Sequence, residues 1–542
     1  MNRWAMGGAA AFAALTLATP RAEACGGFFC SNQPMDQAGE NILFAIEGDG
    51  TMTTVVQILY SGEADRFAWI LPIPSVPTLS VGTDALFDQL AATTQPRFQL
   101  SYEQTGTCRM EPSCWDGRYE DTADPGSPGS DAGAFADAGA SGPTVVLREV
   151  VGPYDAVVLS GGTAEQLHQW LTDNDYEIPE SSIPLIASYV ESGHLFVAIR
   201  LLSDRSTTEI QPLVMRYSEP EPCVPIRLTA IATVPDMPII AYFLGDARAV
   251  PTNYSLVEGE PNDPGLFLGT RSYQSYLSEA VDAAGGRAFM TDYAGVTPSL
   301  SLEAASVADL ATLTSPRAFM QALMMRGYTG DSQLLALLTR FMPPPEGMDP
   351  QSYYNCLAQS WCSGVEGALD APGLVAAIDE TIVRPRADAT AMLARHARTT
   401  RLATTMSAAE MTIDPTFRLD RGVDQDVSNL HQARLVTECA PEYYYWSAPQ
   451  HMVLPDGTEV HLRDGVPYYG DDDDYCDDMR AGEWGPWVDR ERLLRTSERS
   501  RLRPAGGGPI CSAQPGVRHT TGALVALGIV ALGIAARRRR SR

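Results

Sequence analysis

The chain contains no lysine, so arginine supplies every Lys/Arg-type positive charge. Its 67 acidic residues against 39 basic ones give a formal net charge of −28. A surface of that sign repels phosphate groups, so the composition argues against a nucleic-acid partner. We attribute the missing lysine to codon bias in a GC-rich genome rather than to a function.

Short motifs that identify common active sites are also missing. There is no Gly-x-Ser-x-Gly nucleophile elbow, no His-Glu-x-x-His metalloprotease motif and no Gly-rich phosphate-binding loop. The sequence Gly330-Asp331-Ser332 begins a predicted helix, where Asp and Ser are ordinary capping residues. No catalytic residue is predicted. This favours a binding or structural module, and a secreted hydrolase-type enzyme with an unfamiliar site is the alternative.

No cofactor is predicted, although one acidic cluster allows calcium. A calcium loop alternates its ligands and turns at a glycine, whereas contiguous aspartates point in several directions. A solvated acidic loop is therefore favoured, with calcium as the alternative, at Asp471, Asp472, Asp473 and Asp474. Five further side chains are of types that bind zinc, but their spacing in the sequence matches no known zinc motif. They are His431, Cys439, His451, His461 and Cys476.

Residues 1–24 have the pattern of a signal peptide. Arg3 precedes the apolar stretch Ala5–Leu17, and Ala22-Glu23-Ala24 forms an A-x-A cleavage signal. We expect cleavage between Ala24 and Cys25, which implies export across the inner membrane. Acylation of Cys25, as in a lipoprotein, is the alternative.

The C-terminal end has the pattern of an anchor. A spacer at 499–520 contains Cys511 and leads to a predicted transmembrane or sorting helix at 521–536. An arginine block resists crossing and keeps the tail 537–542 cytoplasmic; it consists of Arg537, Arg538, Arg539 and Arg540. The apolar stretch is about 15 residues, below the roughly 20 of a comfortable span. A processed sorting signal is favoured over an ordinary single-span anchor.

Ten cysteines in an exported chain indicate disulfides rather than free thiols. The candidate pairs that spacing suggests are Cys25 with Cys30, Cys108 with Cys114, Cys356 with Cys362, and Cys439 with Cys476. Cys223 then has no obvious partner. If Cys511 serves the tail, nine cysteines remain, so one is free or modified.

The fold class expected is α+β, with a β-rich N-terminal half carrying packed helices. Ile42–Glu47 and Thr53–Tyr60 predict a hairpin, and Ile226–Thr233 predicts a further strand. Thr163-x-x-Gln166 is a capping box that begins a helix. After about residue 272 the pattern becomes mostly helical.

Residues 25–435 are expected to form the body of the protein, with a mainly helical part at 272–400. Residues 116–143 are rich in Asp, Gly, Ser, Ala and Pro and predict a flexible insertion. A disulfide-bearing acidic extension follows at 436–498. Its aromatic run Tyr443–Trp446 favours core packing or hairpin pairing, with a sugar or partner platform as the alternative.

The body resembles a family catalogued as domain of unknown function 2330. The motifs that carry the resemblance are Cys25-Gly-Gly-Phe-Phe-Cys30, Phe67-Ala-Trp-Ile-Leu-Pro-Ile-Pro74, Val151-Gly-Pro-Tyr-Asp155, Pro225-Ile-Arg-Leu-Thr-Ala230, Arg248-Ala-Val-Pro-Thr-Asn-Tyr254 and Glu410-Met-Thr-Ile-Asp-Pro-Thr-Phe417. The resemblance implies no activity, substrate or site.

The tail is similar to the MYXO-CTERM sorting signals of myxobacterial-type surface proteins, which combine a cysteine, an apolar helix and an arginine cluster. This resemblance implies that Cys511 is the processing or lipid-attachment position. The expected partners are the membrane and a sorting protease or lipidation machinery, with a protein or glycan partner unspecified. The expected location is the cell envelope or outer surface of a Gram-negative bacterium.

Overall fold

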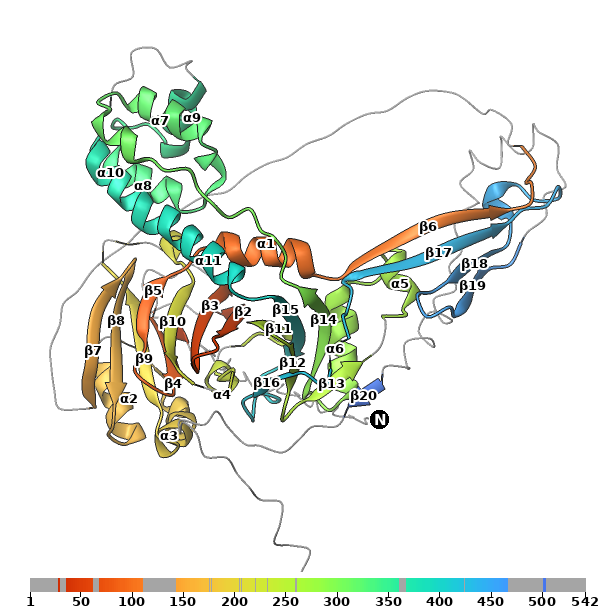
Figure 1. Cartoon of the computed structure of the whole chain (residues 1–542), viewed down its shortest axis with the longest axis horizontal. Coiled ribbons are helices and arrows are strands. Elements are labelled where there is room, and N and C mark those ends of the chain that lie inside the picture. Colours follow the sequence, from red (N-terminus) through yellow and green to blue (C-terminus); the bar gives the residue numbers. More distant parts are fainter. Residues whose placement is uncertain are drawn as a thin grey trace, which may run out of the picture.

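The structure is a computed structural model that describes residues 28–29, 36–61, 68–110, 143–359, 367–465 and 501–503. Within these ranges, short gaps fall at 175, 177, 204, 206, 220, 232, 259–260 and 424. The fold is α+β, as expected, and its centre consists of two β-sheets that pack face to face (Figure 1).

The larger sheet has nine strands. In spatial order these are β20 (Arg501–Arg503), β13 (Ser255–Glu258), β14 (Ala288–Val296), β15 (Arg398–Met406), β11 (Met237–Gly245), β2 (Asp36–Ile46), β3 (Thr51–Ser61), β10 (Leu213–Ser218) and β5 (Thr78–Val81). The predicted hairpin is confirmed, because β2 and β3 pair antiparallel around the turn at Gly48-Asp49-Gly50.

The smaller sheet has five antiparallel strands. In spatial order these are β1 (Phe28–Phe29), β4 (Ala68–Ile73), β9 (Leu195–Leu201), β8 (Tyr154–Ser160) and β7 (Thr144–Val151). A two-stranded ribbon of β12 (Arg248–Pro251) and β16 (Phe417–Asp420) lies beside the large sheet.

Helices cover the outer faces of both sheets, which gives four layers. Strand side chains alternate between faces, so Ala156 and Val158 of β8 pack between the sheets while Val157 and Leu159 pack outward. The outward residues meet α2 (Ala164–Asp173) and α3 (Ile183–Glu191). On the large sheet, α1 (Asp84–Thr94) and α11 (Arg384–Ala394) cover Leu43 and Ala45 of β2.

The capping box at the start of α2 is confirmed, with Thr163 and Gln166 bonding each other's backbone N–H groups. The strand predicted at Ile226–Thr233 is wrong. Residues Ile226–Thr229 form helix α4, and both Ile226 and Leu228 are buried. A short apolar alternation fits either period when the residues on both faces are covered, so the sequence pattern could not distinguish the two.

The chain extends from the four layers in two directions (Figure 1). A helical unit with its own core contains α7 (Pro316–Met325), α8 (Leu334–Phe341), α9 (Pro350–Gln359) and α10 (Ala371–Ile378). An arm is formed by β6 (Arg97–Thr105), β17 (Leu430–Glu438), β18 (Gln450–Val453) and β19 (Glu459–Arg463). The arm packs at its base on α5 (Pro264–Phe267) and α6 (Tyr273–Ala283).

None of the helices in the described ranges has the length and apolar character needed to cross a membrane. The predicted helix at 521–536 lies outside those ranges, as do the signal peptide at 1–24 and all of the insertion at 116–143 except Pro143.

Candidate functional site

A cavity of about 40 Å³ lies between the two sheets, lined mainly by apolar side chains with a few polar ones. That volume accommodates about three water molecules, and a drug-sized ligand needs several hundred Å³. The titratable and hydroxyl groups on its walls are Glu40, Thr54, His194, Tyr217, Glu219 and Glu221.

Glu40 enters the cavity because it lies on the same face of β2 as Ile42 and Phe44. It is 4% exposed, and its carboxylate accepts a hydrogen bond from Gln37 Nε2 at 3.2 Å. Burial disfavours the charged form and raises the pKa of Glu40 to about 7. This carboxyl therefore changes charge near neutral pH.

Glu219 follows β10 and is also buried, which raises its pKa to about 7. The backbone N–H of Glu221 donates to its carboxylate at 3.3 Å and opposes the shift. On the same strand the Tyr217 hydroxyl contacts Thr54 Oγ1 at 2.8 Å, and burial raises the pKa of Tyr217 to about 12. Tyr217 is thus a neutral phenol.

His194 directly precedes β9 and lines the cavity. Its ring packs edge-on against Tyr189, with the ring centroids 5.5 Å apart. It is buried, which lowers its pKa, so the ring is neutral at pH 7. Neither ring nitrogen has a hydrogen-bond partner within the described residues. The cavity wall therefore includes two carboxyls with a raised pKa, Glu40 and Glu219, and a neutral imidazole, none of which bonds another.

The described histidines lie at separate places instead of forming one site. The ring of His168 bonds the Ile178 carbonyl at 3.0 Å, His451 contacts Glu438 at 3.0 Å, and His461 contacts Asp464 at 2.8 Å. His396 lies 3.6 Å from Glu47, and His431 stacks on Phe98. None of these contacts joins a histidine to a hydroxyl or a thiol.

Asp331 lies just before α8, close to the helix start that the sequence predicts. The Asp331 carboxylate accepts the Gln333 N–H at 2.9 Å and pairs with Arg386 at 2.5 Å. Groups of three or more metal-type side chains are also absent from the described ranges.

A buried polar cluster centred on Asp414 joins α3 and α4 to the loops that follow β12 and precede β16. The Tyr189 hydroxyl donates to Asp414 Oδ1 at 2.8 Å, and the Arg227 N–H donates to the same oxygen at 3.1 Å. Asn253 Nδ2 donates to the Asp414 carbonyl at 2.7 Å. Burial raises the pKa of Asp414 to about 6. We name this group, Tyr189, Arg227, Asn253 and Asp414, the Asp414 cluster.

The comparison with protein families bears on these same segments. The family described as "Uncharacterized protein conserved in bacteria (DUF2330)" matches residues 19–340. The chain belongs to this family. No curated protein and no solved structure matches it.

The DUF2330 region contains every wall residue of the cavity. Three motifs that carried the resemblance meet in the Asp414 cluster: Pro225–Ala230 supplies Arg227, Arg248–Tyr254 supplies Asn253, and Glu410–Phe417 supplies Asp414. The last motif lies beyond residue 340. Its contacts join segments that lie far apart in the sequence, through hydrogen bonds to Asp414.

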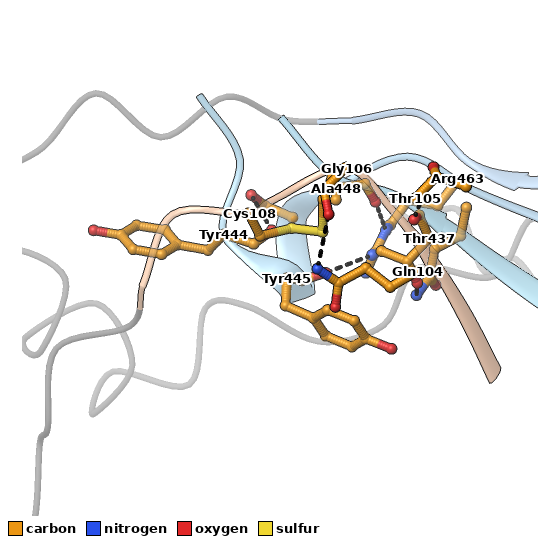
Figure 2. Close-up of a disulfide and its surroundings, with 12 residues drawn as sticks. Gln104, Thr105, Gly106, Cys108, Thr437, Tyr444, Tyr445, Ala448 and Arg463 are labelled. Atoms are coloured by element: carbon orange, nitrogen blue, oxygen red, sulfur yellow. Dashed lines mark hydrogen bonds between the residues drawn. A yellow bond between two sulfur atoms is a disulfide. The ribbon is translucent and has the colours of Figure 1, made fainter. Parts of the chain in front are cut away.

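The disulfide of the arm corrects two predicted pairs. Cys108 bonds Cys439, 331 residues away, instead of Cys114, and Cys439 is therefore not paired with Cys476. Figure 2 shows this bond where β6 ends, with Tyr444 and Tyr445 directed away from it. Gly106 has a φ of 71°, and a Cβ there would collide with the Cys439 carbonyl. A glycine is thus required for the close approach of the two segments.

Cys223, for which no partner was expected, is disulfide-bonded, and so is Cys356. The predicted pairing of Cys356 with Cys362 stays a prediction, because Cys362 lies outside the described residues.

The aromatic run packs into the end of the arm. Tyr444 is buried and stacks on Trp446 at 6.0 Å, while the Arg109 guanidinium lies 5.1 Å from the Tyr444 ring centre. Tyr445 remains exposed. The run therefore stabilises the arm rather than forming a flat platform.

Several predicted site residues lie outside the described ranges, so their roles stay predictions. They are Ala24 and Cys25 at the signal cleavage site, the cysteines Cys30, Cys114 and Cys476, the calcium candidates Asp471, Asp472, Asp473 and Asp474, and the sorting residues Cys511, Arg537, Arg538, Arg539 and Arg540. Sequence reasoning missed Glu40 and Asp414. Glu40, Ile42 and Phe44 are spaced two residues apart, which is the signal that could have placed Glu40 on the buried face of the strand.

Proposed function

We propose that this DUF2330 protein is exported across the inner membrane and held at the envelope or outer surface of a Gram-negative bacterium, where it acts as a binding or structural module. The observation that carries the proposal is the oxidised state of its cysteines. Cys108, Cys223, Cys356 and Cys439 are all disulfide-bonded. Disulfides persist in oxidising compartments and are rare in the bacterial cytosol.

The proposed route uses the signal peptide at 1–24 and the tail from Cys511 onward. The tail would contact the membrane through residues 521–536 and be processed by a sorting protease or lipidation machinery. A binding or structural role is supported by the scattered histidines, by the small cavity and by the long arm. The arm provides exposed surface, and the sheets provide a rigid support for it.

The experiment follows an epitope-tagged full chain on intact cells by protease accessibility. The wild-type chain should be digested from outside and should lose its tail. Cys511→Ala should retain the tail and lose surface display, while Ser512→Ala, one residue away, should behave as wild type. Unchanged display and tail length in Cys511→Ala would refute the sorting route.

A hydrolase-type enzyme is the second candidate, favoured by the two carboxyls whose pKa of about 7 suits proton transfer near neutral pH. It predicts that Glu40→Gln or Glu219→Gln lowers hydrolysis of an ester or peptide library. Identical turnover by the wild type and both variants would remove this candidate.

A further inference from the structure

The arm presents one strand edge that has no partner in the described part of the chain. Strand β6 pairs in parallel with β17 along its whole length, from Arg97 opposite Leu430 to Thr105 opposite Glu438. The order β19-β18-β17-β6 leaves β6 at the border of the sheet. The arm projects away from the four layers (Figure 1), so this edge is accessible.

The hydrogen bonds of β6 reveal which backbone groups face outward. The Arg97 N–H donates to Asn429 O at 2.7 Å, and Thr105 O accepts from the Cys439 N–H at 2.8 Å. The backbone N–H and C=O groups of the odd-numbered residues of β6 therefore point toward β17. Successive residues alternate in direction, so the N–H and C=O groups of Phe98, Leu100, Tyr102 and Gln104 point to the open edge.

Exposure of side chains increases along the same strand. Phe98 and Leu100 are half-buried against the base of the arm, whereas Tyr102 on the same face is 70% exposed. An open strand edge with a large exposed aromatic is a template for pairing with another strand. Proline, which commonly blocks such an edge, does not occur between Arg97 and Thr105.

We propose that β6 pairs antiparallel with β6 of a second copy of this chain, joining two arms into one eight-stranded sheet. Full overlap of the strand with itself places Ser101 on the two-fold axis. The outward groups then match in hydrogen-bonded pairs, Leu100 with Tyr102 of the second copy and Phe98 with Gln104.

The sequence of the strand is complementary to itself in this register. Leu100 covers the exposed ring of Tyr102 twice, once on each side of the axis. Gln99 faces Glu103 and Arg97 faces Thr105, so no like charges oppose each other. Glu103 is already paired with Arg434 of its own chain. A foreign strand would have to reproduce this pattern, whereas a second copy carries it.

Two features favour the association despite the net charge of −28 on each copy. In this register the four layers of the two copies lie at opposite ends of the paired strands, and charge repulsion weakens with distance in salt. The Cys108–Cys439 disulfide fixes the far end of β6 to β17, so this end of the strand is held in place before it meets its partner. Such preorganisation reduces the entropy lost on binding. The inference goes beyond the proposed function, since it does not depend on anchoring at the envelope.

Cysteine trapping tests the register in the full chain. A non-hydrogen-bonded antiparallel pair has its Cα atoms about 4.5 Å apart, within reach of a disulfide. Ser101→Cys should therefore form a covalent dimer on a non-reducing gel after mild oxidation. Glu103→Cys is the matched control, because its twin lies four residues along the strand, roughly 13 Å away, and it should stay a monomer.

Co-purification of two differently tagged full-length copies tests the edge itself. Wild-type copies should co-purify, and Tyr102→Lys in both copies should abolish this. Val296→Lys, on an equally exposed apolar residue of β14, should retain it. The proposal is overturned if wild-type copies do not associate, if Tyr102→Lys copies still do, or if Ser101→Cys is trapped on a different protein instead of its twin.

Discussion

Glu40 lies buried between the two sheets, where its charged form loses its contact with water. Its neighbours Ile42 and Phe44 contribute to the central core, and Gln37 supplies its hydrogen bond. One neutral hydrogen bond offsets only part of the desolvation of a charge. The protein therefore keeps this carboxyl protonated until about pH 7.

The first prediction concerns the pH dependence that this carboxyl causes. The pKa of Glu40 is raised from 4.5 to about 7 on folding. Between these values the folded chain holds a proton that the unfolded chain has lost, so the free energy of unfolding falls as pH rises. The contribution is fully present below pH 4.5 and is lost by about pH 7, a change of roughly 3 kcal/mol.

Glu40→Gln removes this titration and keeps an acceptor for Gln37. Melting temperatures at pH 5 and pH 8 should differ less for the variant than for the wild type, and the variant should be the more stable at pH 8. Glu442→Gln, on an exposed carboxylate, is the control. Equal pH dependence of the wild type and Glu40→Gln would contradict the assignment.

The second prediction concerns the Asp414 cluster. Asp414→Ala leaves the Tyr189 hydroxyl and the Arg227 N–H without their acceptor. Each unsatisfied buried donor costs about 1–3 kcal/mol, so we expect a loss of about 3 kcal/mol in urea unfolding. Asp414→Asn retains Oδ1 and should lose less than half of that. Equal losses in both variants would show that the hydrogen bonds are not the cause.

Elements formed by neighbouring residues were predictable, and those formed by distant ones were not. The β2–β3 hairpin and the start of α2 follow from local alternation and capping. The pairing of β6 with β17 leaves no local signal, because a parallel pair of distant strands is joined by no turn. For the same reason the short spacing in the sequence suggested Cys114 as the partner of Cys108. The pairing of β6 with β17 instead brings Cys439 next to Cys108.

The third prediction concerns the arm as an element. In the double variant Cys108→Ser/Cys439→Ser, amides near Thr105 and Glu438 should exchange with deuterium faster, because the covalent link at that end is lost. Amides near Phe98 should be unchanged, since its ring packs on Phe267 with centroids 5.4 Å apart. Local opening is governed by such local contacts.

The exposed Met110 provides the control, because Met110→Ser alters the same end of the arm without touching the disulfide. Its exchange pattern should match that of the wild type. Uniform acceleration along β6 and β17 in the double variant would mean that the disulfide stabilises the whole arm rather than its far end.

At the scale of the molecule, the folding unit is larger than the matched region 19–340. Strand β15 lies beyond that limit, yet it pairs with β14 on one side and β11 on the other. It also contributes Leu402 and Met406 to the central core. The matched region therefore ends before an interior strand of the large sheet is supplied.

The fourth prediction follows from this position of β15. A chain that ends at residue 340 lacks β15, so the edges of β11 and β14 that pair with it are left open. It also lacks Asp414, which accepts the hydrogen bond of the Tyr189 hydroxyl. Unpaired backbone groups in the middle of a sheet are costly, so this fragment should show no cooperative thermal transition and should aggregate. A chain that ends at residue 465 keeps every described strand except β20 and should melt cooperatively. Circular dichroism on both, with disulfides formed, distinguishes these outcomes. A cooperative transition in the shorter fragment would show that β15 is dispensable and that the matched region folds alone.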